Sequence, residues 1–160
     1  MEKINIYSFL DQITAKIDYY LEINEMKIYH EYCYEKESAK GNKKFIKIPR
    51  ISSKQYQKIK EDFFKKEIPE NIKKKFNSYL KDYHNEYHAA FHNFVIDYDY
   101  EDAWYNYEEQ ELIKEAISFC TINNIEYIVD RDNVDFNIFI MPNFEDKEFV
   151  EYFNKKFKFD

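Results

Sequence analysis

The spacing of apolar residues predicts short elements at the start of the chain. A helical spacing favours a helix over residues 5–14. Apolar and polar residues then alternate in two runs, IDYYLEI (17–23) and MKIYHEYCY (26–34), separated by two polar residues. Such alternation is typical of strands with one buried face, so the two runs predict a β-hairpin. A polar loop (35–44) and a short strand (44–49) follow.

The clearest helix start in the sequence is ISSKQY. Ser52 precedes the helical pattern, and Gln55 stands three residues later, which is the spacing of a capping box. Pro69 suits the first turn of a further helix, because its missing N–H would be unpaired there in any case. That helix is expected to carry Ile72, Phe76, Leu80 and Tyr83.

Helical periodicity continues through the middle of the chain. An aromatic stripe from Tyr87 to Tyr98 predicts one helix, and a longer amphipathic run from Asp99 predicts the next. The run is expected to end at Asn123-Asn124, since Asn tolerates the left-handed conformation that closes many helices.

The remaining residues predict a second hairpin and a last helix. The two strands would be IEYIV (125–129) and VDFNIFIM (134–141), and Asn143 would cap a helix carrying Phe149, Phe153 and Phe157. No linker and no internal repeat interrupts the pattern. The expected fold class is therefore α+β, with amphipathic helices packed on small antiparallel β-hairpin sheets in a single domain spanning residues 1–160.

Composition excludes several enzyme classes. The chain has 160 residues, 44% of them hydrophobic, which is enough for one domain with its own core. Its one glycine, Gly41, cannot supply the glycine-rich phosphate loops of nucleotide-binding enzymes or the GxSxG elbow of serine hydrolases.

Cys33 and Cys120 form no CxxC motif, and no signal peptide or membrane span is evident, so we expect two reduced thiols in a cytoplasmic protein. No motif indicates a cofactor.

The stretch FHNFVIDYDYEDAWYNYEEQELIKEAISFCTINNIEY (91–127) resembles a bacterial family catalogued as uncharacterised, UPF0158. The family pattern is a Phe-rich helix, a short acidic link, Trp-Tyr, and a second helix ending in Asn-Gly-Ile. The matching positions here are Phe91, Phe94, Trp104, Tyr105, Ala116, Asn123 and Ile125. IDYYLEI and FIKIPRIS resemble the family's first strand and its strand-to-helix junction.

This resemblance covers residues 4–128, which leaves 129–160 as a C-terminal hairpin and helix extension. Asn124 and Met26 stand where the family has Gly. The resemblance implies an existing bacterial fold and supplies no catalytic residue, because the family has no assigned function.

The most distinctive local stretch is DYDYEDAWYNY (97–107), with four carboxylates and five aromatic residues. A calcium loop would need a Gly for its sharp turn and a closing Glu, and neither is present. Acids at a helix start and a solvated surface explain most of the pattern. Tyr among acids also suits a protein-docking surface, because Tyr offers apolar area with a polar tip. The candidate partner-binding residues are Asp97, Tyr98, Asp99, Tyr100, Glu101, Asp102, Trp104 and Tyr105.

Three histidines form a second candidate site. His84, His88 and His92 lie four residues apart and would share one helical face, where two His can bind Zn²⁺. No third and fourth ligand can be identified from the sequence. A metal-dependent enzyme around His84 and His88 is therefore a second alternative, and the rim of an aromatic stripe is the more ordinary interpretation.

Charge is unevenly distributed along the chain. Residues 40–81 carry fourteen Lys and Arg against four Asp and Glu, whereas residues 82–151 carry three against eighteen. The basic block could bind nucleic acid by gripping phosphates beside aromatic residues. Its candidate contacts are Lys43, Lys44, Arg50, Lys73, Lys74 and Lys75. Against this alternative, the chain has a net charge of −7, which would repel a polyanion.

Two acids in the first predicted hairpin are candidates for an acid–base pair. Asp18 and Glu31 would face each other across the first hairpin if the turn has two residues, and opposed carboxylates can form an acid–base pair. Because like charges destabilise a sheet, we expect that the two do not meet.

The leading hypothesis is a small non-catalytic binding protein that engages a partner protein through its acidic, Tyr-rich surface, as immunity proteins and inhibitors do. The sequence leaves the partner and the oligomeric state open.

Overall fold

The computed structural model describes residues 3–157, which divide into two compact units. Unit 1 consists of the N-terminal part up to Arg50 and the C-terminal part from Ala116, and unit 2 is Ile51–Glu115. The second boundary falls inside one long helix, so both units contain part of it. The fold is α+β, as the sequence predicts.

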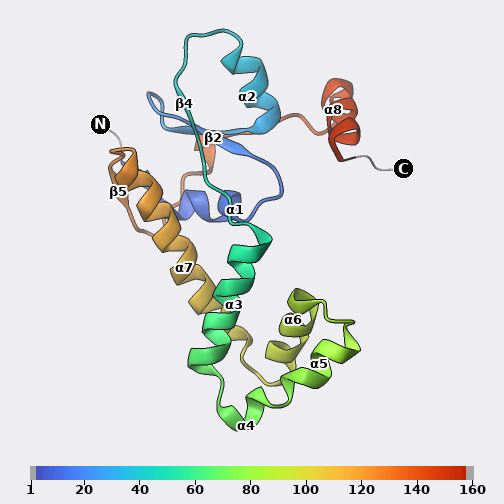
Figure 1. Cartoon of the computed structure of the whole chain (residues 1–160). Helices are drawn as coiled ribbons and strands as arrows, with labels where there is room; N and C mark the ends of the chain where they lie inside the picture. The colour runs from blue at the N-terminus through green and yellow to red at the C-terminus, as the bar shows by residue number, and fades with distance from the viewer. Residues whose placement is uncertain (1–2, 158–160) are drawn as a thin grey trace. The chain divides into compact units, whose positions relative to one another are not determined.

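Unit 1 contains a four-stranded mixed sheet in the order β4-β2-β3-β6 (Figure 1). The first hairpin is confirmed, since β2 pairs antiparallel to β3 with Glu22 opposite Lys27. Strand β4 pairs antiparallel to β2, whereas β6 pairs parallel to β3. The strands are β2 (Tyr19–Glu22), β3 (Lys27–His30), β4 (Phe45–Lys47) and β6 (Phe139–Ile140).

The predicted second hairpin is wrong. Strand β5 (Tyr127–Ile128) pairs parallel with β1 (Ile4–Asn5) in a separate two-stranded sheet, while β6 joins the main sheet. The two predicted strands therefore pair with different N-terminal segments and not with each other. The Asn5 side chain contributes to this arrangement, because its Nδ2 donates to the Asp130 carbonyl at 2.6 Å.

The first helix of unit 1 is where the sequence predicts it, whereas α2 was not predicted and α8 begins later than predicted. A 3-10 turn (η1, Ile6–Phe9) and α1 (Leu10–Ile13) form the expected first helix. Helix α2 (Glu31–Ser38) replaces the end of the predicted strand and the start of the predicted loop, because the His30 ring caps it by accepting from the Tyr32 N–H. The last helix, α8 (Lys147–Phe157), starts after an Asp146 cap and not at Asn143.

Unit 2 is helical, with α3–α6 and the first part of α7 (Figure 1). The Ser52–Gln55 capping box is confirmed by both of its hydrogen bonds. The predicted helix after Pro69 is broken into α4 and α5, and the two predicted helices that follow are present as α6 and α7. The bounds are α3 (Ser53–Glu67), α4 (Glu70–Lys73), α5 (Phe76–Asp82), α6 (Tyr87–Asp97) and α7 (Glu101–Ile122).

An aromatic core holds unit 2 together. Its fully buried centre includes Phe63, Phe91 and Phe94, and the Trp104 ring packs edge-on against Phe91 at 4.9 Å between centroids. Helix α3 comes from the Lys-rich block, and α6 and α7 come from the acidic block. Helices of opposite charge therefore share one hydrophobic core.

Candidate functional site

The candidate site is the corner between α6 and α7, residues 97–102, which we call the acidic corner. Asp97 ends α6, Glu101 begins α7, and Asp99 between them has a left-handed backbone (φ 61°). The turn is closed by the Tyr100 N–H, which donates to the Val95 carbonyl at 2.7 Å. The carboxylates are thus fixed at a tight turn between two helices.

The carboxylates of the acidic corner point to solvent. Asp97, Asp99 and Asp102 are exposed and Glu101 is half-buried. Within residues 3–157, no Lys or Arg forms an ion pair with any of these four acids. Their negative charge is therefore available to a molecule outside the chain.

Tyr79 of α5 and Lys75, which directly precedes α5, contact residues of the acidic corner. The Tyr79 hydroxyl donates to Asp97 Oδ2 at 2.7 Å, and this hydrogen bond raises the pKa of Tyr79 to about 12. The Lys75 ammonium lies 5.7 Å from the centroid of the Tyr98 ring. No local sequence signal joins residues 18 and 23 positions apart, so only the tertiary structure identifies Tyr79 and Lys75 as neighbours of the corner.

The aromatic residues predicted for this surface have different positions. Tyr105 is 45% exposed, and Tyr98 and Tyr100 are half-buried against the core of unit 2. Trp104 is 4% exposed, so its inclusion among the partner-binding residues is wrong. Its helical position on α7 turns the indole toward the core, where Phe63, Phe91 and Tyr56 surround it.

Residues 3–157 provide no cluster of metal-binding side chains. Among the described residues, no three His, Cys, Asp or Glu side chains come together in a way that could hold an ion. The acidic corner therefore has the geometry of a helix boundary with exposed acids, without the enclosing ligand set that calcium needs.

The predicted helical row of histidines is wrong. His84 lies in the left-handed turn before α6 (φ 54°), and only His88 and His92 are on the helix. Both ring nitrogens of His88 are already engaged, with Nε2 3.2 Å from Ser53 Oγ and Nδ1 2.8 Å from Lys60 Nζ. His92 is exposed.

Lys60 is a buried cation that the sequence analysis missed. It is 7% exposed, and its ammonium lies 4.7 Å from the Tyr56 ring centroid and 5.4 Å from that of Phe91. Burial lowers the pKa of Lys60 to about 8, and the Glu86 charge partly offsets this shift. Its helical spacing from Tyr56 and Phe63 could have indicated the buried face of α3.

The basic residues proposed for nucleic acid are split between the two units. Lys43, Lys44 and Arg50 belong to unit 1, while Lys73, Lys74 and Lys75 belong to unit 2. Lys43, Arg50 and Lys73 form hydrogen bonds or ion pairs within the chain, and Lys75 lies over the Tyr98 ring. Lys43 donates to the Tyr29 hydroxyl at 2.9 Å, Arg50 pairs with Asp18 at 2.8 Å, and Lys73 pairs with Glu70 at 3.0 Å.

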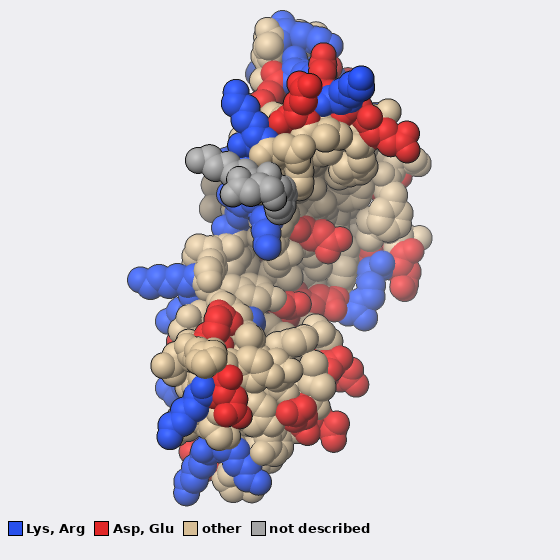
Figure 2. All heavy atoms as spheres, turned by 90° about the vertical axis from the view of Figure 1, so that its right-hand side faces the viewer, with Lys and Arg blue, Asp and Glu red and all other residues tan. Residues whose placement is uncertain are grey.

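The acidic block is divided in the same way. Its residues 82–115 belong to unit 2 together with most of the basic block, which gives unit 2 ten Lys against fourteen Asp and Glu. Figure 2 shows basic and acidic side chains on the same face of the molecule. The acidic block therefore does not form a separate negative half of the chain, because basic residues accompany it in unit 2.

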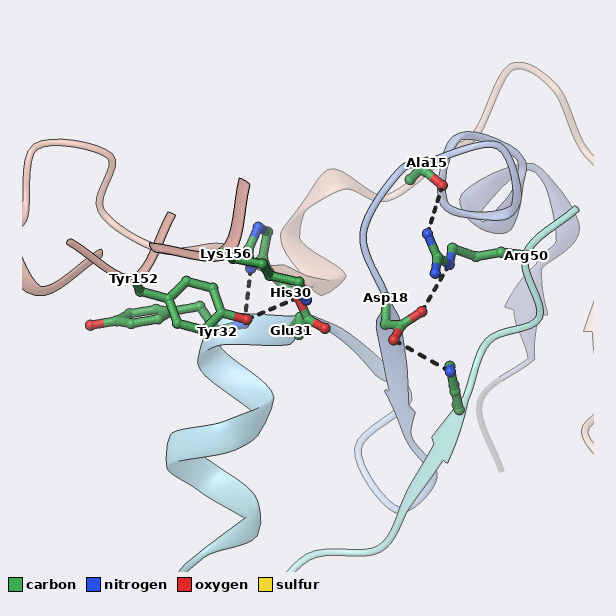
Figure 3. Close-up of polar contacts among 9 residues, drawn as sticks. Ala15, Asp18, His30, Glu31, Tyr32, Arg50, Tyr152 and Lys156 are labelled. Carbon is green, nitrogen blue, oxygen red and sulfur yellow. Dashed lines mark hydrogen bonds and ion pairs between the residues drawn. The ribbon is translucent and has the colours of Figure 1, made fainter. Parts of the chain in front are cut away.

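Asp18 and Glu31 do not meet, as expected. Asp18 is held by Arg50 and Lys47, whereas the buried Glu31 carboxylate accepts from the Tyr152 hydroxyl at 2.9 Å and pairs with Lys156 of α8 (Figure 3). These acids fasten segments of unit 1 together, and neither forms an acid–base pair with the other.

Comparison with models of protein families identifies a match. A model described as "Uncharacterised protein family (UPF0158)" matches residues 3–143. The chain belongs to this family. The UPF0158 match extends past residue 128, so residues 129–143 with β6 are part of it, and α8 lies beyond it. No curated protein and no solved structure matches this UPF0158 chain. Within residues 3–157, no helix has the length and apolarity needed to cross a membrane.

Proposed function

We propose that this UPF0158 protein is a non-catalytic binding protein that captures a partner protein bearing a basic surface. The observation that carries the proposal is the acidic corner, where four carboxylates stand at a tight helix boundary and none forms an ion pair with a Lys or Arg of the described chain. Fixed charges of one sign attract an oppositely charged surface and accelerate its association.

The tyrosines around the corner support the same function. Tyr105 is exposed, and the half-buried Tyr98 and Tyr100 rings rest on the core, which limits their side-chain motion. Tyr residues held in this way contribute apolar contact area at low entropic cost. The partner is therefore expected to present Lys or Arg for the carboxylates and an apolar patch for the rings.

The test is a pull-down with two charge-matched variants. One neutralises the corner (Asp97→Asn, Asp99→Asn, Glu101→Gln and Asp102→Asn), and the other neutralises four exposed acids of unit 1 (Glu126→Gln, Asp132→Asn, Glu145→Gln and Glu151→Gln). Both change the net charge by the same amount. The corner variant is expected to lose a partner that the unit 1 variant retains, with the association rate falling by about tenfold or more.

Salt concentration provides the second measurement. Capture by the unmodified protein should weaken steeply between low and high salt, because exposed charges are screened. Equal capture by all three proteins, or capture that does not respond to salt, would contradict the proposal.

A further inference from the structure

Helix α8 docks on the N-terminal end of α2 through a small part of its surface. Eight of its eleven residues are exposed, and Phe149 is its one buried side chain. The Phe149 ring packs edge-on against Tyr32 and His30, at 5.4 and 5.8 Å between centroids, and the Tyr152 ring lies 5.2 Å from that of Tyr32. The apolar part of the contact is therefore one aromatic anchor with its neighbours.

The polar part of the docking surface is the carboxylate of Glu31, the first residue of α2. Glu31 is 7% exposed, and its hydrogen-bond and ion-pair partners within residues 3–157 both come from α8 (Figure 3). The Tyr152 hydroxyl donates to it at 2.9 Å, and the Lys156 ammonium pairs with it. A carboxylate covered by a helix is costly unless that helix brings donors and a cation. The surface therefore selects the chemistry of the helix that covers it.

Three side chains of α8 supply this chemistry from one helical face. Phe149, Tyr152 and Lys156 stand at positions i, i+3 and i+7, which is the spacing of neighbours along a helix. The Lys36–Glu148 pair at the edge is exposed and is expected to contribute little. Recognition of a helix through anchors at this spacing is a common mode of peptide binding.

The docking surface belongs to the family core, whereas α8 does not. The UPF0158 match ends at residue 143, so it includes His30, Glu31 and Tyr32 and excludes α8. Residues 143–146, which lead into α8, are exposed. A helix of eleven residues is marginal by itself in water, so α8 depends on its contact with α2. A helix held in this way can be exchanged for another that offers the same three side chains.

We propose that the surface formed by His30, Glu31 and Tyr32 is a docking site for a helix of a partner protein, and that α8 occupies this site until the partner displaces it. The partner helix carries an aromatic residue, a Tyr and a Lys at positions i, i+3 and i+7, and its Lys complements the Glu31 charge. Because α8 is tethered, it competes at an effective concentration in the millimolar range. The site lies in unit 1 and is independent of the acidic corner in unit 2.

The proposal is tested by fluorescence anisotropy with two labelled peptides. One is residues 144–157, and the other is an Ala-rich host helix that carries only Phe, Tyr and Lys at the same spacing. The receptor is the full chain with Phe149→Ala, which is expected to release α8 and leaves the docking surface unchanged. This receptor should bind both peptides at least about tenfold more tightly than the unmodified chain does. Val150→Ala, at an exposed position of α8, should bind them as the unmodified chain does.

Substitutions in the peptide are controls that do not affect folding of the receptor. A 144–157 peptide with Phe149→Ala or Lys156→Glu should bind at least about tenfold more weakly. Adding Glu31→Gln to the receptor should remove its preference for Lys over Glu at position 156 of the peptide. The proposal is overturned if the released chain binds neither peptide, if it binds the 144–157 peptide alone, or if the substituted peptides bind as tightly as the original.

Size-exclusion chromatography of the unmodified full chain distinguishes a partner helix from a second copy of this chain. Elution should not change with protein concentration, because α8 fills the site of its own chain. A dimer that grows with concentration and is lost in Phe149→Ala would identify α8 of a second copy as the occupant and would overturn the proposal.

Discussion

At the scale of single residues, two non-glycine residues adopt a backbone conformation that favours glycine. Met26 and Asn124 have left-handed backbones, with φ angles of 52° and 56°. They are the two positions at which the family resemblance places Gly. Asn tolerates this conformation better than most residues, and Met does so only under constraint. Burial of the Met26 side chain, 9% exposed, compensates part of the strain.

Asn124→Gly should stabilise the protein. The Ile125 N–H donates to the Cys120 carbonyl at 2.8 Å across this helix end, so the left-handed geometry is required. Gly adopts it without steric cost, and the free energy of unfolding should rise by a few tenths to about 1 kcal/mol. Asn124→Ala should lower it by about 1 kcal/mol. Urea denaturation measures both, and an increase for Ala would contradict the assignment.

Lys60 should make stability depend on pH. Its pKa is about 8 in the folded protein because of burial, whereas an unfolded Lys has a pKa of about 10.4. The unfolded state therefore binds more protons between these two values, and the free energy of unfolding should rise as pH increases from about 8 to 10. Below pH 8 the ammonium is charged in both states and the burial penalty is complete.

The Lys60→Met variant isolates this effect. It should show a smaller rise in stability than the unmodified protein between pH 8 and 9.5, as measured by urea denaturation. Lys58→Met, at an exposed position of the same helix, should keep the original pH dependence. Identical pH profiles for Lys60→Met and the unmodified protein would exclude Lys60 as the cause.

At the scale of elements, the predictions that depend on neighbouring residues were confirmed, whereas the predicted pairing of the two C-terminal strands was wrong. The Ser52 cap, the first hairpin and helices α6 and α7 depend on residues close in sequence, and all are present as predicted. The strands β5 and β6 were expected to pair with each other and pair instead with β1 and β3. Both candidate pairings satisfy the same short apolar runs, so the sequence pattern could not choose between them.

Helix α8 offers an element-scale test. Phe149 is 5% exposed, and its ring packs edge-on against Tyr32 and His30 at 5.4 and 5.8 Å between centroids. Phe149→Ala should therefore release α8, because the largest buried side chain of its docking face is lost. Hydrogen exchange should accelerate in residues 147–157 and remain unchanged in α6.

Val150→Ala serves as the control for this experiment, since Val150 is on the same helix and 42% exposed. Its exchange should resemble that of the unmodified protein. Faster exchange in both variants would indicate that α8 is sensitive to any truncation, and that the Phe149 contact is not what holds it.

At the scale of the whole molecule, the linear charge pattern does not become two oppositely charged halves. Each unit combines basic and acidic segments, and each has a net negative charge, −4 for Ile51–Glu115 and −3 for the remainder of the chain. The helices are amphipathic, so hydrophobic packing brings the Lys-rich and acidic segments of unit 2 around one core. In the part of the chain that the structure describes, the four carboxylates of the acidic corner form no ion pair with Lys or Arg.

This charge distribution predicts weak binding to nucleic acid. A mobility-shift assay with single-stranded and duplex RNA and DNA should show no retained complex at physiological salt. Neither unit has a net positive charge, and Lys43, Arg50 and Lys73 already form hydrogen bonds or ion pairs within the chain. A complex that is lost in a Lys73→Gln, Lys74→Gln, Lys75→Gln variant would instead support the basic block as an interface.

The sequence by itself determined the class of fold, the family, the helix start capped by Ser52 and the position of the acidic corner, because each depends on residues within a few turns of one another. Only the tertiary structure decided which short strands pair, that Trp104 is buried, that Lys60 contacts His88, and that Glu31 pairs with residues of α8. These features join segments far apart in the chain. They depend on which packed arrangement buries the most apolar surface with the fewest unpaired polar groups, and a local pattern of residues does not contain that comparison.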